Sequence, residues 1–151
     1  MDETDSDTFI VGFGSTEHKR LQFAFTGPDL ARSRVLYDDW LEPIVSVQAG
    51  PFSGTTRVYI SASDFVRFLP QLRSLYDTLH GTATFDTIER QVGFTLTGDG
   101  KGHITLAGFL EDRAGGDNCI EFRLSYDQTL LPSSISQIGH LLHTTTKTRK
   151  A

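Results

Sequence analysis

The sequence predicts an α+β domain: a strongly twisted, mainly antiparallel sheet of about seven or eight strands, curled into a sandwich or an open barrel, with two packed helices. Three observations lead to this fold class. Eleven Phe and fourteen Gly residues favour pleated strands joined by tight turns. Apolar and polar residues alternate along most of the chain, and in two places the apolar period changes to that of a helix. Strands joined by tight turns pair in the antiparallel direction.

The strands are predicted from short alternating runs bounded by Gly, Pro, Asp or Asn. The clearest run places Leu21, Phe23 and Phe25 on one face. The segment Gly98–Gly102, "GDGKG", is a strong hairpin signal, because Asp-Gly suits turns that need positive φ. The expected strands are residues 9–13, 20–26, a strand within 33–41 that contains Val35 and Tyr37, and residues 44–50, 55–61, 82–89, 90–98, 103–111 and 118–127.

The first helix is predicted over residues 63–79, where seven apolar residues follow a helical period. Ser61 and Asp64 have the spacing of a capping box, and Gly81 follows the last apolar position as a C′ residue. Pro70 should face solvent, and it either bends this helix or begins a shorter one. The apolar stripe consists of Phe65, Phe68, Leu69, Leu72, Leu75, Tyr76 and Leu79.

The second helix is predicted over residues 130–143, with Ile135, Ile138, Leu141 and Leu142 on its apolar face. Ser134 and Gln137 have the spacing of a second capping box. Asp127 and Thr129 lie just before this helix, where side-chain oxygens accept hydrogen bonds from unpaired amides. This position favours a capping role over a catalytic role for the Asp127-Gln128-Thr129 cluster.

Charge excludes one class of partner. The net charge is −5; residues 1–7 contribute −4 and residues 147–151 contribute +3, so residues 8–146 hold −4 by themselves. No cluster of Lys and Arg suits the neutralisation of phosphates, which argues against direct nucleic-acid binding. We expect a single domain over residues 9–144 between a disordered acidic tail, residues 1–8, and a disordered basic tail, residues 145–151.

A cytoplasmic protein is the expected location. The N-terminal segment lacks the apolar core of a signal peptide, and no apolar run is long enough to span a bilayer. The single Cys119 fits a reducing compartment and is read as a structural thiol.

Few residues have the spacing of a catalytic or metal site, and we expect no metal and no cofactor. His140 and His143 could share a helical face, but no carboxylate accompanies them, so solvent-facing histidines are favoured. Asp38 and Asp39 are paired acids, yet neighbours on a strand point to opposite faces.

Several segments, in order along the chain, resemble the WapI-like immunity protein family. They are "WL…IVSVQAGPFSG" from Trp40, "DFVRF", "LYDTLHGTATF", Glu89, "GDGKGHI" and "NCIEFRLSYDQT". The residues that match the family pattern are Phe52, Ser53, Gly54, Gly100, Gly102, His103, Asp127, Gln128 and Thr129, and the resemblance assigns none of them a catalytic role. It extends from Trp40 to Leu142, and the first forty residues match poorly.

The resemblance implies a non-enzymatic protein that binds a cognate bacterial toxin domain and occludes it. A toxin that acts on nucleic acid is often basic, and the acidic domain would help to steer such a partner. The candidate contact residues are Asp38, Asp39, Trp40, Glu42, Glu111, Asp112 and Asp117. The alternatives are a small ligand-binding or hydrolytic β-barrel that uses His103, Glu89 and Asp127, and an interaction module without a toxin partner. Oligomeric state stays open.

Overall fold

The described residues form two antiparallel sheets covered by two helices. In this computed structural model the structure describes residues 8–15, 17–27 and 40–149. The first sheet has the strand order β1-β2-β4-β5 and the second β10-β9-β8-β7, while β3 and β6 form a short separate pair. The α+β class and the antiparallel pairing are therefore confirmed.

The strands of the first sheet are β1 (Phe9–Gly14), β2 (Lys19–Phe25), β4 (Ile44–Ala49) and β5 (Phe52–Arg57). Those of the second are β7 (His80–Phe85), β8 (Val92–Asp99), β9 (His103–Glu111) and β10 (Cys119–Asp127), and the short pair is β3 (Trp40–Leu41) with β6 (Ile60–Ser61). The described strands number ten, against about seven or eight predicted. Nine segments were expected to be strands, and the one expected at 55–61 is divided between β5 and β6. The strand expected around Val35 and Tyr37 lies outside the described residues, apart from its end in β3.

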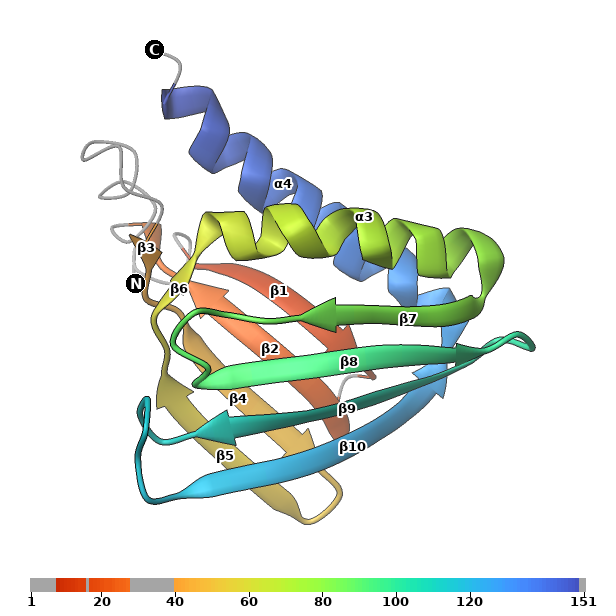
Figure 1. Cartoon of the computed structure of the whole chain (residues 1–151), viewed down its shortest axis with the longest axis horizontal. Coiled ribbons are helices and arrows are strands. Elements are labelled where there is room, and N and C mark those ends of the chain that lie inside the picture. The colour runs from red at the N-terminus through yellow and green to blue at the C-terminus, as the bar shows by residue number, and fades with distance from the viewer. Residues whose placement is uncertain (1–7, 16, 28–39, 150–151) are drawn as a thin grey trace, which may run out of the picture.

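The two sheets cross, and the helices lie together on one side of them (Figure 1). Helix α3 (Ala62–Thr78) packs along β7, helix α4 (Leu131–Arg149) packs along β1, and the two helices contact each other. Strand β10 contacts β1, β2 and β4 of the other sheet. The helices therefore cover β1 and β7, while β5 and β10 lie on the opposite side of the molecule (Figure 1).

A cluster of phenylalanine rings forms the centre of the core. The ring centroid of Phe23 in the first sheet lies 5.6 Å from that of Phe65 in α3 and 5.7 Å from that of Phe85 in the second sheet. Edge-to-face and tilted ring pairs of this kind add to the stabilisation from burial. The rings of this cluster, all nearly fully buried, belong to Phe13, Phe23, Phe25, Phe65, Phe68, Phe85 and Phe94.

Helix α3 begins as predicted and ends differently. The Ser61 side chain accepts from the Ser63 amide, and the Asp64 carboxylate accepts from the Ser61 amide at 2.8 Å, so the capping box is confirmed. Pro70 lies inside one continuous helix on its exposed side. The left-handed residue at the C-terminus is Leu79 with φ 61°, whose amide donates to the Leu75 carbonyl, so the prediction that Gly81 has this role is wrong. Tyr76 is 40% exposed rather than part of the buried stripe.

Helix α4 follows a short 3-10 helix, η1 (Gln128–Leu130), and continues to Arg149, beyond the predicted end at His143. The predicted capping box of Ser134 and Gln137 is wrong. The Ser134 hydroxyl donates to the Gly12 carbonyl at 2.5 Å, and the Gly12 amide donates to Gln137 Oε1 at 2.8 Å. Both side chains therefore hold α4 to β1. They do not cap the helix, because α4 already begins at Leu131, three residues before Ser134.

No helix in the described part of the chain combines the length and the apolar character required to cross a bilayer.

Candidate partner-binding site

Gln91 joins the two sheets at one end of the molecule. It is 2% exposed, and its Nε2 donates to the Arg57 carbonyl at 2.9 Å and to the Glu111 carbonyl at 3.2 Å. The Gln91 carbonyl in turn accepts from the Glu111 amide at 2.8 Å. The end of β5, the start of β8 and the end of β9 are thereby held side by side. Sequence reasoning missed Gln91, and no local pattern marks it, because its partners lie on other strands.

Two predicted contact residues precede β4 at the same end. Trp40 is 38% exposed and pairs with Ser61 in the short β3–β6 ladder. A Glu42 carboxylate oxygen lies 3.9 Å from an Arg57 guanidinium nitrogen, and the Glu42 side chain is 25% exposed. Asp38 and Asp39 lie outside the described residues.

Three more predicted contact residues lie at the end of β9 and in the β9–β10 loop, which is braced internally. The Asp112 amide donates to the Asn118 carbonyl at 3.0 Å, and the Asn118 side chain donates to Asp112 Oδ2 at 2.9 Å. This side-chain hydrogen bond is the main reason why the pKa of Asp112 is lowered. Glu111 Oε1 accepts from the Gly115 amide at 3.2 Å, and Asp117 is exposed.

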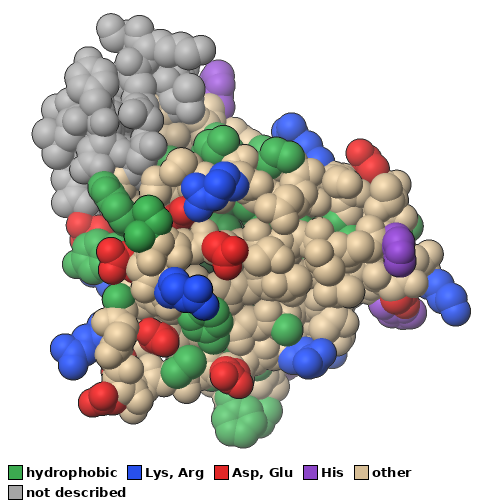
Figure 2. Space-filling view, in the orientation of Figure 1, with side chains coloured by type: hydrophobic (Ala, Val, Ile, Leu, Met, Phe, Trp, Pro, Cys, Tyr) green, Lys and Arg blue, Asp and Glu red, His purple; other side chains and the backbone are tan. Residues whose placement is uncertain are grey.

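Through Arg57 and Gln91 the structure brings both segments to one end of the fold. We call this set of residues the acidic end: Trp40, Glu42, Glu111, Asp112 and Asp117. Acidic side chains gather on this side of the molecule, with basic side chains among them (Figure 2). The set holds four carboxylates and one exposed aromatic ring.

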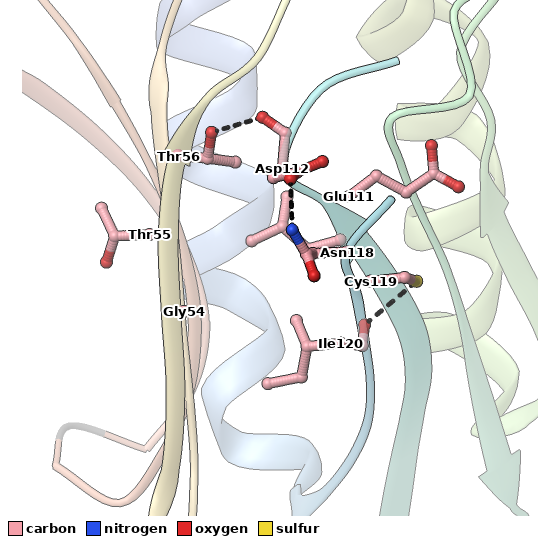
Figure 3. A pocket seen from close by; sticks show the side chains of 9 residues that line it. Gly54, Thr55, Thr56, Glu111, Asp112, Asn118, Cys119 and Ile120 are labelled. Carbon is pink, nitrogen blue, oxygen red and sulfur yellow. Dashed lines mark hydrogen bonds between the residues drawn. The ribbon is translucent and has the colours of Figure 1, made fainter. Parts of the chain in front are cut away.

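A cleft adjoins the acidic end, between the edge strands β5 and β10. Its volume is about 260 Å³, and it is lined by Gly54, Thr55, Thr56, Leu110, Glu111, Asp112, Asn118, Cys119 and Ile120. We call it the β5–β10 cleft. Figure 3 shows the two strands side by side, with the Thr56 hydroxyl donating to the Asp112 carbonyl at 2.9 Å. Desolvation and the neighbouring Glu111 and Glu121 carboxylates raise the pKa of the Cys119 thiol, so this exposed cysteine lacks the environment of a nucleophile.

The Asp127-Gln128-Thr129 cluster caps the start of the C-terminal helical segment. Asp127 Oδ1 accepts from the Thr129 amide at 3.0 Å at the N-cap of η1, which confirms the capping role predicted for Asp127. The Gln128 amide donates to the Gly102 carbonyl at 2.9 Å, so the β8–β9 hairpin is attached to this cap. Gly102 has φ 104°, a conformation that a residue with a Cβ rarely adopts.

The β8–β9 hairpin is organised by one carboxylate. Asp99 Oδ1 accepts from the Lys101 amide at 2.6 Å and from the His103 amide at 3.1 Å, and Asp99 Oδ2 lies 3.1 Å from His103 Nδ1. These hydrogen bonds, that from Lys101 foremost, lower the pKa of Asp99. His103 is thus part of a turn. The other family-pattern residues, Phe52, Ser53 and Gly54, lie at the start of β5, and Gly100 lies in the hairpin turn.

The alternative catalytic set is not assembled. His103 and Asp127 are paired across β9 and β10. Glu89, however, precedes Val92, which pairs with Leu110 at the far end of β8. Eight residues of extended β8 therefore separate Glu89 from the hairpin, a distance of about 25 Å at the usual rise per residue. The three side chains do not converge, so a hydrolytic site built from them is wrong.

His140 and His143 are exposed, and the His140 ring lies 5.1 Å from that of Phe9. Among the described residues no three His, Cys, Asp or Glu side chains are grouped as metal ligands.

The fold and site define a small two-sheet α+β protein with an acidic end and a cleft between β5 and β10 beside it. The chain belongs to the immunity protein WapI-like family, whose model matches residues 12–145. No curated protein and no solved structure matches it. The prediction that the first forty residues match poorly is corrected, because the match begins at Gly12 and includes the end of β1 and all of β2.

Proposed function

We propose that this protein neutralises a cognate toxin domain by binding and occluding it, without catalysis, in the cytoplasm of the cell that makes the toxin. Membership of a family of immunity proteins is the observation that carries this proposal. The absence of a convergent nucleophile and base among the His103, Glu89 and Asp127 side chains supports a binding role over a hydrolytic one.

The acidic end is the proposed toxin-binding surface. The Glu42 carboxylate lies beside Arg57, and the buried Gln91 side chain joins the Arg57 and Glu111 backbones, so the surface is pre-formed and its ordering adds little to the cost of binding. Trp40 offers an aromatic anchor, a residue type enriched among interface hot spots. The carboxylates of the β9–β10 loop favour a basic partner, and their attraction acts mainly on the rate of association.

The test is co-expression with the C-terminal toxin domain encoded beside this gene, followed by measurement of the dissociation constant. We expect growth to be rescued by the wild-type protein, with nanomolar binding typical of protein complexes of standard interface size, about 10⁻⁹ M. Association should slow as salt is raised. Growth arrest together with the absence of binding would contradict the proposal.

Charge reversal locates the surface. Asp117→Lys and Glu111→Lys should each slow association with the toxin domain, and the double variant should slow it further. Asp77→Lys is the matched control, because Asp77 is an exposed acid near the C-terminal end of α3 and receives the same change of charge. Equal association rates for all the variants would remove the acidic end from the interface while leaving the immunity function in place.

A further inference from the structure

One edge strand of the first sheet, β5, is hydrogen-bonded to a neighbouring strand on one side only in the described structure. The two four-stranded sheets end in β1, β5, β7 and β10. Helix α4 packs on β1 and helix α3 on β7, whereas β5 and β10 border the β5–β10 cleft. An uncovered edge presents backbone donors and acceptors that a further strand can use.

The register shows which β5 backbone groups point outward. The Val58 amide donates to the Pro43 carbonyl, and hydrogen-bonded pairs recur at every second residue of an antiparallel ladder. Counting back from Val58, the inward-bonded residues of β5 are 56, 54 and 52, so Ser53, Thr55 and Arg57 direct their backbone groups away from β4. The bond from Gln91 Nε2 to the Arg57 carbonyl agrees with this assignment. Within the described residues, the outward groups of Ser53 and Thr55 have no hydrogen-bond partner.

The side chains of β5 leave this edge accessible. Positions 53–56 hold only small residues, Ser, Gly, Thr and Thr, and the strand carries no Lys or Pro within it. Strand β10 differs, since Glu121, Arg123 and Asp127 place charges along its exposed face, one of the ways in which natural edges discourage pairing. Gly54 has no side chain to fill the cleft. A Cβ at this position would lie 3.5 Å from the Ile120 side chain on the opposite side of the cleft.

The lining of the cleft indicates the chemistry of its occupant. Two acidic residues, Glu111 and Asp112, line the cleft, and no Lys or Arg is among its lining residues. The Glu111 side chain points away from β5 (Figure 3), so the carboxylate nearest the β5 edge is that of Asp112. The apolar part of the lining comes from Leu110 and Ile120. A segment with an apolar side chain could contact Leu110 and Ile120, and a Lys or Arg on the same segment could pair with the acidic lining.

We propose that an extended, basic segment of the toxin domain adds as a further strand to the outer edge of β5 in the β5–β10 cleft. This inference rests on the proposed function and specifies how the partner is held. The outward amides and carbonyls of Ser53 and Thr55 supply main-chain hydrogen bonds, which give affinity, while the carboxylate of Asp112 favours a basic side chain. The added strand extends the first sheet from β1-β2-β4-β5 to five strands.

The decisive variant is Thr55→Pro, which removes one outward donor and places a ring where the added strand would lie. It leaves the β4–β5 ladder intact, because the Thr55 amide does not take part in it. Thr55→Ala is the matched control that changes the side chain and keeps the amide. Ser125→Pro is the control for a proline on an edge, since the Ser125 amide points outward from β10 by the same register argument.

We expect Thr55→Pro to weaken binding of the toxin domain about tenfold or more, the effect of losing a main-chain hydrogen bond and close approach. Thr55→Ala and Ser125→Pro should bind within about twofold of wild type. Equal unfolding midpoints establish that the variants are folded. If Thr55→Pro does not fold, Ser53→Pro replaces it, because the Ser53 amide also points outward.

Amide exchange on the wild-type complex tests the same contact without a substitution. Toxin binding should slow exchange of the Ser53 and Thr55 amides. Unchanged exchange at both, together with wild-type affinity of the proline variant, overturns strand addition while leaving the immunity function established. Absence of any binding by the wild-type chain overturns both proposals. A dimer of this chain that Thr55→Pro converts to a monomer assigns the edge to a second copy and overturns the toxin segment as its occupant.

Discussion

Replacing Gln91 tests whether one buried amide holds the acidic end together. Gln91→Leu retains most of the side-chain volume and removes the Nε2 donor. The Arg57 and Glu111 carbonyls, which accept from it at 2.9 and 3.2 Å, then lose their side-chain partner. The Asp112 carbonyl lies 3.4 Å from Nε2 and keeps its bond from the Thr56 hydroxyl, so it adds little to the loss.

The expected cost follows from these two bonds. Each contributes about 1 kcal/mol net, so the free energy of unfolding should fall by about 2 kcal/mol. For a chain of 151 residues this corresponds to a decrease in Tm of roughly 4–8 °C. The backbone bond from the Glu111 amide to the Gln91 carbonyl is unaffected by the substitution, which limits the loss.

Denaturant unfolding monitored by fluorescence and circular dichroism measures this cost. Gln48→Leu is the matched control, because the Gln48 side chain donates only to the nearby, exposed Gly50 carbonyl. This control should change the free energy of unfolding by less than about 0.5 kcal/mol. The denaturant slope m should be the same in all three proteins. If Gln91→Leu is as stable as Gln48→Leu, the buried amide does not hold the sheets together and the reasoning fails.

Three further predictions concern stability. Ser134→Ala removes the buried hydroxyl that holds α4 to β1 and should cost about 1–3 kcal/mol in denaturant unfolding, whereas Ser136→Ala on the exposed face should cost little. Gly108→Ala places a Cβ 2.6 Å from a carbonyl oxygen of β8 and should destabilise the protein by about 1–3 kcal/mol. Gly139→Ala, with no atom within 4 Å of its added Cβ, should be neutral or stabilising. A less stable Gly139→Ala than Gly108→Ala would contradict this packing. The pKa of Asp99 is lowered in the folded protein, so its contribution to stability is present above pH 3.8, the ordinary value, and is lost as pH falls through the lower folded value. Asp99→Asn should therefore reduce the loss of stability at acid pH, measured by unfolding at a series of pH values. An unchanged loss of stability would mean that another group causes it.

Much of the fold and part of the site were predictable from short-range patterns. The period-two runs located most strands, and the capping box at Ser61 and the cap at Asp127 were predicted because their partner amides lie within three residues. The same local rule failed for Ser134 and Gln137, whose partner on β1 is more than 120 residues away in the sequence. A tertiary contact therefore takes both side chains that the local spacing assigned to a cap.

The sequence by itself determined the α+β class, the family resemblance and the acidic character of the domain. It also determined the two helices, one before and one after the strands of the second sheet along the chain. Only the tertiary structure decided that the segments of Trp40 and Glu111 lie at one end, that Gln91 is buried between them and that β5 is an uncovered edge. The physical reason is that periodicity and capping depend on neighbours along the chain. Strand order and the contacts between sheets depend on how distant segments pack, and no local pattern of residues specifies that arrangement.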